Sequence, residues 1–152
     1  MSLVSEVKDK TDPRCHTQNI RRDGYSIDVR CEPQPWLALD FDLPGSPLGE
    51  NDRRPDFLFV GDKGGGRGRL ASVEISKGKD KSADKIVAQL QAGANWAAGK
   101  LSDRHKPRLL PLYLGKLNRY AIKEIKKKDK RVTFRGQAEL IIWLTAPGSR
   151  IP

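Results

Sequence analysis

The stretch RRPDFLFVGDKGGGRGRLASVEISKGK, residues 53–79, decides how this chain folds. It contains two runs that alternate as β-strands do, DFLFV and RLASVEIS, and a glycine-rich segment between them that gives the chain freedom to reverse. We therefore expect a β-hairpin. Asp56 stands at the start of the first strand and Glu74 near the end of the second. The period-two alternation of strands then allows both carboxylates to lie at one end of one face.

Weaker patterns on both sides of this hairpin extend it into an α/β domain. Asp80 and Ser82 are both suitable N-caps for a helix, because apolar residues recur after them at helical spacing. The order of the patterns predicts one domain, residues 1–152, with a central mixed β-sheet flanked by helices. The expected elements are strands over residues 25–31, 35–42 and 106–116, helices over residues 82–100 and 118–130, and a closing hairpin over residues 131–146 that turns near Gly136.

The composition favours a polyanionic partner. Twenty-nine Lys and Arg residues against 19 Asp and Glu give a formal net charge of +10 over 152 residues, which favours nucleic acid. Two cysteines are too few for a disulfide framework, and Cys15, His16 and Cys31 lack the paired spacing of a zinc site. No apolar run reaches the length of a membrane span or resembles a signal peptide, so we expect a cytoplasmic protein with no membrane partner.

Asp56 and Glu74 are the candidate catalytic and metal-binding residues. Mg²⁺ prefers hard oxygen ligands and commonly uses one or two carboxylates completed by water and substrate phosphate. Such a metal lowers the pKa of a bound water and neutralises the charge that develops on the phosphate. A nearby lysine would position that water or stabilise the transition state. Asp40 and Asp42, which share a strand face, and Glu6 are further carboxylates for such a site.

This arrangement resembles the PD-(D/E)xK superfamily, the restriction-endonuclease-like nucleases, whose motif is an acid after proline, a hairpin, and acid-x-Lys on the next strand. Pro55-Asp56 matches the first half, and the order of hairpin, helix and strand matches the family's core over about two-thirds of the chain. The resemblance implies cleavage of nucleic-acid backbones dependent on Mg²⁺ or Mn²⁺, often by homodimers. Small basic members include Holliday-junction resolvases, so the resemblance favours structured DNA over RNA as the substrate.

The second half of the motif departs from the family pattern. Ser76 occupies the place of the lysine, and Lys77 comes one residue late, where a regular strand would point it to the opposite face from Glu74. Three arrangements would still permit catalysis: a bulge near Gly78 that returns Lys77 to the acids, a lysine from the helix such as Lys85 with Gln89 one turn along, or chemistry without lysine. We favour the bulge.

Two other functions compete with a nuclease. The first is a catalytically inactive nucleic-acid-binding module on the same fold, and the second is an interaction protein that binds an acidic protein partner. The nuclease and the inactive binding module would both contact nucleic acid through three groups of basic residues. These groups are the arginines before Asp56, the hairpin tip and the lysine run near the C-terminus. These candidates are Arg53, Arg54, Lys63, Arg67, Arg69, Lys126, Lys127 and Lys128.

Overall fold

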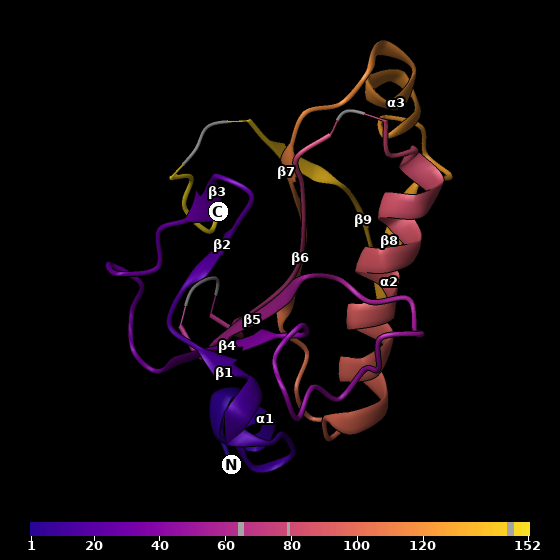
Figure 1. Ribbon diagram of the computed structural model, residues 1–152. Helices are drawn as coiled ribbons and strands as arrows, with labels where there is room; N and C mark the ends of the chain where they lie inside the picture. The colour runs from indigo at the N-terminus through magenta and orange to yellow at the C-terminus, as the bar shows by residue number, and fades with distance from the viewer. Residues whose placement is uncertain (64–65, 79, 146–147) are drawn as a thin grey trace.

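The structure is a computed structural model that describes residues 1–63, 66–78, 80–145 and 148–152 (Figure 1). Its centre is a mixed sheet with the strand order β1-β4-β5-β6-β7-β10. β1, β4, β5 and β6 pair antiparallel, whereas β7 runs parallel to both β6 and β10. The bounds of these strands are His16–Thr17 for β1, Trp36–Asp40 for β4, Phe57–Gly61 for β5, Arg69–Ser76 for β6, Arg108–Gly115 for β7 and Ile142–Leu144 for β10.

Helices and two small hairpins cover the sheet. The helices are α1 (Leu3–Asp9), the 3-10 turn η1 (Pro13–Cys15), α2 (Ala83–Lys100) and α3 (Arg119–Glu124). The hairpins are β2 (Ile20–Arg22) with β3 (Tyr25–Ile27), and β8 (Arg131–Phe134) with β9 (Gln137–Leu140). In Figure 1, α2 and the β8–β9 hairpin lie on one side of the sheet, and the β2–β3 hairpin and the C-terminus lie on the other. The expected α/β class with a mixed central sheet is thus confirmed.

The hairpin predicted from residues 53–79 forms β5 and β6, and it sits in the middle of the sheet. Both strands are buried on both faces, so the sheet separates two apolar clusters. Leu58, Leu70 and Leu90 belong to the cluster under α2, whereas Phe57 and Val73 belong to the cluster under the β2–β3 hairpin. Burial from two sides is typical of central strands and fixes their register.

α2 links the parallel strands β6 and β7, and it begins where the sequence predicts. The Ser82 side chain accepts a hydrogen bond from the Lys85 N–H at 3.2 Å, as an N-cap does. Ser72 Oγ donates to the Leu90 carbonyl at 2.9 Å, and a Cβ on Gly93 would lie 2.5 Å from the same Oγ. The missing side chain at Gly93 therefore lets α2 approach β6 closely, beside Pro55.

Two expected elements differ from the structure. The basic helix predicted over residues 118–130 ends as α3 at Glu124, because apolar side chains that pack inward stop at Ile125 and a lysine run follows. The closing hairpin turns at Gly136, as predicted, but its last residues form β10, which leaves the hairpin and pairs with β7. Among the described helices, none is long and apolar enough to cross a membrane.

Candidate active site

Asp56 and Glu74 lie next to each other at one end of the β5–β6 pair. Phe57 pairs with Val73, and the Asp56 N–H donates to the Val73 carbonyl at 2.9 Å, so Asp56 extends the ladder to the position opposite Glu74. Asp56 Oδ2 accepts a hydrogen bond from the Ile75 N–H at 2.7 Å. This backbone contact fixes the Asp56 carboxylate over β6, so the predicted placement of the two acids is what the fold produces.

Glu74 is buried, and its environment disfavours the charged form. Glu74 belongs to β6, which lies between β5 and β7 in the centre of the sheet, and its Oε1 has no hydrogen-bond partner among the described residues. Burial, and then the neighbouring Asp56, raise the pKa of Glu74 to about 8, while Lys81 acts in the opposite direction. A buried oxygen without a partner beside a second carboxylate is a place where a cation would be stabilised.

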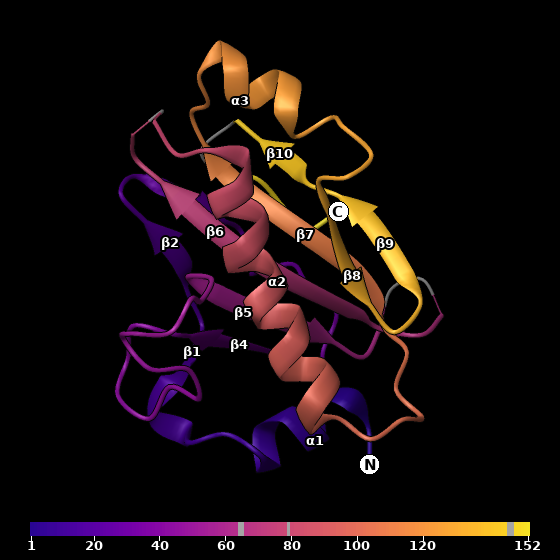
Figure 2. The ribbon, with the colours of Figure 1, turned by 90° about the vertical axis from the view of Figure 1, so that its right-hand side faces the viewer.

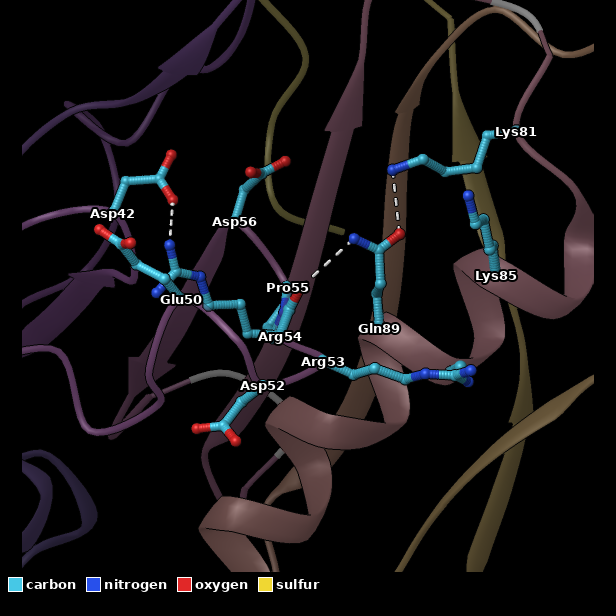
Figure 3. Close-up of a pocket in the computed structure, with 11 residues that line it drawn as sticks. Asp42, Glu50, Asp52, Arg53, Arg54, Pro55, Asp56, Lys81, Lys85 and Gln89 are labelled. Carbon is cyan, nitrogen blue, oxygen red and sulfur yellow. Dashed lines mark hydrogen bonds and ion pairs between the residues drawn. The ribbon is translucent and has the colours of Figure 1, made fainter.

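The lysine that contacts Glu74 is Lys81. Its Nζ forms an ion pair with Glu74 Oε2 and donates to Gln89 Oε1 at 2.9 Å (Figure 3). Gln89 in turn donates to the Arg54 carbonyl at 3.4 Å, which connects α2 to the segment before β5. Gln89 was predicted from the sequence, whereas Lys81 was not. The feature of the sequence that could have indicated Lys81 is its position one residue before the N-cap Ser82, in the connection that passes the end of β6.

Lys77 is not brought to the two acids by a bulge. β6 pairs with β7 residue by residue from Arg69 to Ser76, and Lys77 follows as an exposed residue beyond the strand. Within the described residues, the ammonium group on Glu74 thus comes from the connection to α2. This placement corrects the bulge that we favoured, and it also differs from the helical alternative Lys85, which lines the neighbouring pocket without contacting Glu74.

Arg22 holds three aspartates together at the other side of Asp56. Its Nη2 lies 2.9 Å from Asp40 Oδ1 and 3.0 Å from Asp42 Oδ2, and its Nη1 lies 3.4 Å from Asp56 Oδ1. The guanidinium also covers the Phe57 ring at 4.5 Å. The two extra aspartates therefore do approach the site, but a cation of the protein itself stands between them and Asp56. Sequence patterns gave no sign of Arg22, because β2 belongs to a separate two-stranded sheet.

A pocket of about 400 Å³ opens beside Asp56 (Figure 3). Its lining is mixed in charge, with four acidic and four basic side chains, which are Asp42, Glu50, Asp52, Asp56, Arg53, Arg54, Lys81 and Lys85. Arg54 is anchored by Asp42 Oδ1 at 2.9 Å, whereas no ion pair to a described residue engages Arg53 or Lys85. Arg53 and Lys85 are therefore the cations of this pocket that can contact an anionic group such as a phosphate.

The other predicted binding residues lie away from the acids. Lys63 and Arg67 are exposed at the hairpin tip, at the opposite end of β5 from Asp56. Lys126, Lys127 and Lys128 are exposed after α3. Arg69 is 7% exposed, with its guanidinium 2.5 Å from Glu32 Oε2 and over the Phe59 ring. We therefore correct its assignment, because an arginine engaged inside the fold is not free to bind phosphate.

Glu6 also lies away from the acid pair, because its helix α1 is attached at the far end of β5. α1 is tied there by the Val4 N–H, which donates to Asp62 Oδ1 at 2.9 Å, just beyond Gly61. Glu6 itself accepts hydrogen bonds from Lys10 and Ser102. The suggestion that Glu6 contributes to the site is therefore wrong on geometric grounds, and its role is structural.

Asp56 and Glu74 can hold a hard divalent cation only if water and substrate phosphate complete the set of ligands. Among the residues that the structure describes, no group of three or more His, Cys, Asp or Glu side chains is arranged to hold a metal ion. Mg²⁺ does not need such a cage, since one or two carboxylates with water and substrate phosphate suffice. Asp56 and Glu74 supply these two carboxylates, and Glu74 Oε1 has no other partner among the described residues.

Comparisons with protein-family models, with curated proteins and with solved structures find no match for this chain.

Proposed function

We propose that this chain is a divalent-metal-dependent nuclease that cleaves the phosphodiester bonds of nucleic acid, with a restriction-endonuclease-like core of the PD-(D/E)xK type. One observation carries the proposal. Asp56 and Glu74 stand opposite each other at a strand end, Lys81 contacts Glu74, and a pocket of mixed charge that includes Arg53 and Lys85 opens at the same place. An acid pair, a lysine and cations that can contact a phosphate are the parts that metal-assisted phosphodiester hydrolysis requires.

Each residue has a role that follows from its contacts. Asp56 and Glu74 would hold Mg²⁺ or Mn²⁺, and the metal would supply activation of water and neutralisation of charge on the phosphate. Lys81 provides the ammonium group that the motif places at position 76, and Gln89 orients it through the 2.9 Å hydrogen bond. Arg53, together with Arg54 and Lys85 from the other walls of the pocket, holds the phosphate that is cleaved.

Structured DNA is the proposed substrate, as in the junction resolvases that the motif resembles, and a homodimer is the proposed assembly. The substrate proposal rests on the motif and on the net charge of +10, and the homodimer proposal rests on the motif alone. They are tested by the same incubation, with a four-way junction beside linear and single-stranded DNA and RNA, and by the mass of the protein in solution.

The decisive experiment compares cleavage by the wild type with Mn²⁺, Mg²⁺ or EDTA to cleavage by Asp56→Asn and Glu74→Gln. Both variants keep the shape of the side chain and remove a negative ligand, so we expect at least about a hundredfold loss of rate. Asp103→Asn is the matched control, because Asp103 is an exposed aspartate in the turn after α2. Cleavage that survives EDTA, or that survives both active-site variants, would contradict the proposal.

The alternative is a nucleic-acid-binding module without catalysis. A specific observation favours it: Arg22 and Lys81 already place positive charge on Asp56 and Glu74, where a metal would otherwise be needed. Salt-sensitive binding with no cleavage under any metal would select this alternative. Absence of nucleic-acid binding would instead favour the third hypothesis, an acidic protein partner for the basic surface.

A further inference from the structure

The edge of the sheet that carries Asp56 and Glu74 continues into a basic surface. β6 and β7 are parallel, and their last residues, Ser76 and Gly115, pair with each other. The next residue of each strand is a lysine, Lys77 and Lys116, and both lysines are exposed. Parallel strands end at the same edge, so these two lysines leave the sheet beside the strand end that holds Glu74.

α3 lies directly beyond this edge. Figures 1 and 2 both show it past the ends of β6 and β7, beside the N-terminal end of α2. Lys85 lies in the first turn of that helix, and Lys81 directly precedes its N-cap Ser82. An ion pair of 2.6 Å between Lys130 and Asp84 fixes the segment after α3 to the first turn of α2. α3 is therefore held close to the pocket and is not an isolated excursion of the chain.

α3 presents an aromatic ring to solvent among cations. Tyr120 is 72% exposed, more than any other large hydrophobic residue among those described. Ala121 and Ile125 face the core, so the outward face carries Tyr120 and, three residues later, the exposed Lys123. Arg119 is exposed beside them. A single exposed apolar residue needs no explanation, but a tyrosine surrounded by positive charge has the chemistry of a stacking platform.

We propose that Tyr120 and the surrounding cations Lys77, Lys116, Arg119 and Lys123 form a binding surface for single-stranded nucleic acid. The tyrosine ring stacks on an unpaired base, and the cations contact the phosphates on either side. Surfaces of this kind bind single strands without a base code, because every base offers a π-face, whereas a duplex hides those faces in its own stack. Lys77 thereby gains a role in binding.

The inference deepens the proposed nuclease function, on which it rests for the path of the strand. A strand held on α3 passes the end of β6 and reaches the pocket beside Asp56, so the substrate class becomes nucleic acid with an unpaired segment. A junction or a flap satisfies this requirement next to a duplex, and a fully paired linear duplex does not.

The test measures affinity in EDTA, where cleavage does not interfere, with fluorescence-labelled oligothymidylate, oligouridylate and a hairpin duplex of equal charge. Tyr120→Ala should weaken binding of either single strand by about 5- to 100-fold and leave duplex affinity within about twofold. Tyr120→Phe keeps the ring and should bind as the wild type does. Tyr120 is exposed, so neither substitution disturbs the core.

Charge has its own matched pair. Lys116→Ala at the edge beside α3 should lower the salt dependence of single-strand binding, whereas Lys106→Ala, an exposed lysine before β7 at the opposite edge, should not. Equal losses for single strand and duplex in Tyr120→Ala, or no binding of single strands by the wild type, would overturn the inference. If Tyr120→Ala weakens single-strand binding as expected but the wild type cleaves nothing with Mn²⁺, the nuclease proposal is refuted and the binding surface stands. If the wild type cleaves but Tyr120→Ala binds single strands unchanged, the binding surface is refuted and the nuclease proposal stands.

Discussion

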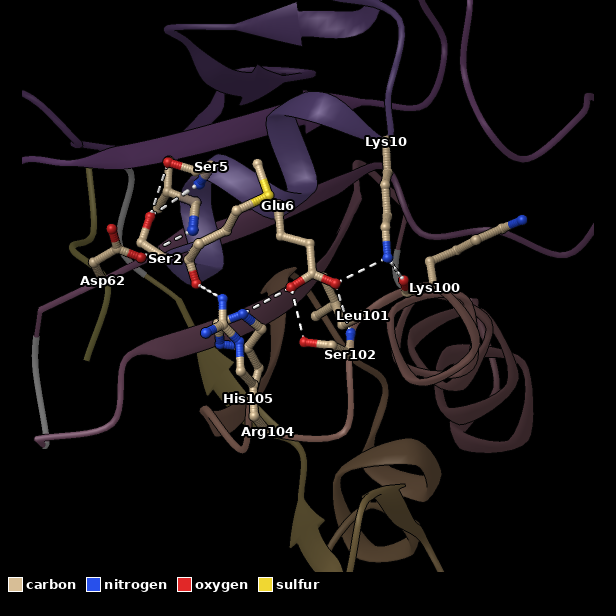
Figure 4. Close-up of polar contacts among 12 residues, drawn as sticks. Ser2, Ser5, Glu6, Lys10, Asp62, Lys100, Leu101, Ser102, Arg104 and His105 are labelled. Atoms are coloured by element: carbon tan, nitrogen blue, oxygen red, sulfur yellow. Dashed lines mark hydrogen bonds and ion pairs between the residues drawn. The ribbon is translucent and has the colours of Figure 1, made fainter.

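Two buried glutamates, Glu6 and Glu74, stand at opposite ends of β5 and β6 in opposite electrostatic states. They are 5% and 2% exposed. Glu6 accepts hydrogen bonds from Lys10 Nζ at 2.8 Å, the Ser102 N–H at 2.6 Å and Ser102 Oγ at 3.0 Å, with His105 Nε2 at 2.8 Å (Figure 4). The donors from Lys10 and Ser102, with Lys10 first, lower the pKa of Glu6 to about 2 in spite of its burial.

Glu74 has the same burial and far fewer partners. Lys81 contacts one of its oxygens, the other has no partner among the described residues, and Asp56 faces it. Burial and Asp56 raise its pKa to about 8. The difference teaches that burial alone does not reveal the role of a carboxylate. A carboxylate with all its donors stabilises the fold, whereas one that lacks them, next to a second acid, is a candidate ligand for the cation that we propose.

The largest expected effect is on stability. Glu6→Ala should lower the free energy of unfolding by about 3 kcal/mol, because it leaves the Ser102 N–H and Oγ without their acceptor and removes the partly exposed ion pair with Lys10. Glu74→Gln should change it by less than about 1 kcal/mol, since burial and Asp56 raise the pKa of Glu74 and so favour a neutral group at this position, which the amide supplies. Urea unfolding at neutral pH measures both. Equal losses would erase the distinction between the two glutamates.

The next effect separates two lysines that flank the connection from β6 to α2. Lys81→Ala should lower kcat about a hundredfold, because it removes the ammonium group on Glu74. Lys77→Ala should raise KM for a single-stranded or branched substrate and change kcat less than about threefold, since Lys77 is exposed beyond the strand. Steady-state cleavage with Mn²⁺ distinguishes the two. A kcat loss of similar size in Lys77→Ala would mean that Lys77 acts at the two acids, as the bulge predicted.

A smaller effect appears in the pH dependence of stability, which we expect to have opposite signs for the two glutamates. The pKa of Glu6 is lowered in the fold, so its contribution is present above about pH 4.5 and is lost as pH falls toward 2. The pKa of Glu74 is raised, so the folded state binds the extra proton, and stability falls as pH rises from about 4.5 toward 8.

Urea unfolding in EDTA from pH 3 to pH 8 measures these slopes, each limited to about one proton. Glu74→Gln should flatten the slope at the neutral end, and Glu6→Gln should flatten it at the acid end. If Glu74→Gln left the neutral slope unchanged, the glutamate would be ionised in the folded state, and Lys81 would dominate Asp56 and burial at that site.

Local patterns were sufficient to predict the acid pair and the helix behind it. Alternation placed Asp56 and Glu74 at one end of the hairpin, and helical spacing after Ser82 placed Gln89 on the face toward the sheet. Both features depend on residues close in sequence. The same holds for β7, whose apolar run follows α2 as it does in a crossover between parallel strands.

Contacts between distant segments were beyond these patterns. Arg22 reaches Asp56 from a hairpin that does not belong to the central sheet, and Arg69 is buried by Glu32, 37 residues earlier. Lys81 lies in an irregular connection, where no period fixes the direction of a side chain. Tertiary packing determines the positions of these side chains. A buried charged residue requires a partner of opposite charge, and the alternation of apolar residues does not predict which residue that is.

The smallest expected effect applies the lesson of the two glutamates to the lysine run after α3. Lys127 Nζ is held by Glu124 at 2.6 Å, whereas Lys126 and Lys128 make no ion pair with any described residue. A cation with a partner in the protein releases fewer counterions when nucleic acid binds. Lys126→Ala and Lys128→Ala should each lower the slope of log affinity against log salt by about 0.7–0.9 where they meet a phosphate, and Lys127→Ala should lower it by less. Titration of a labelled oligonucleotide from low to moderate salt measures the three slopes, and equal slopes would mean that Glu124 releases Lys127 on binding.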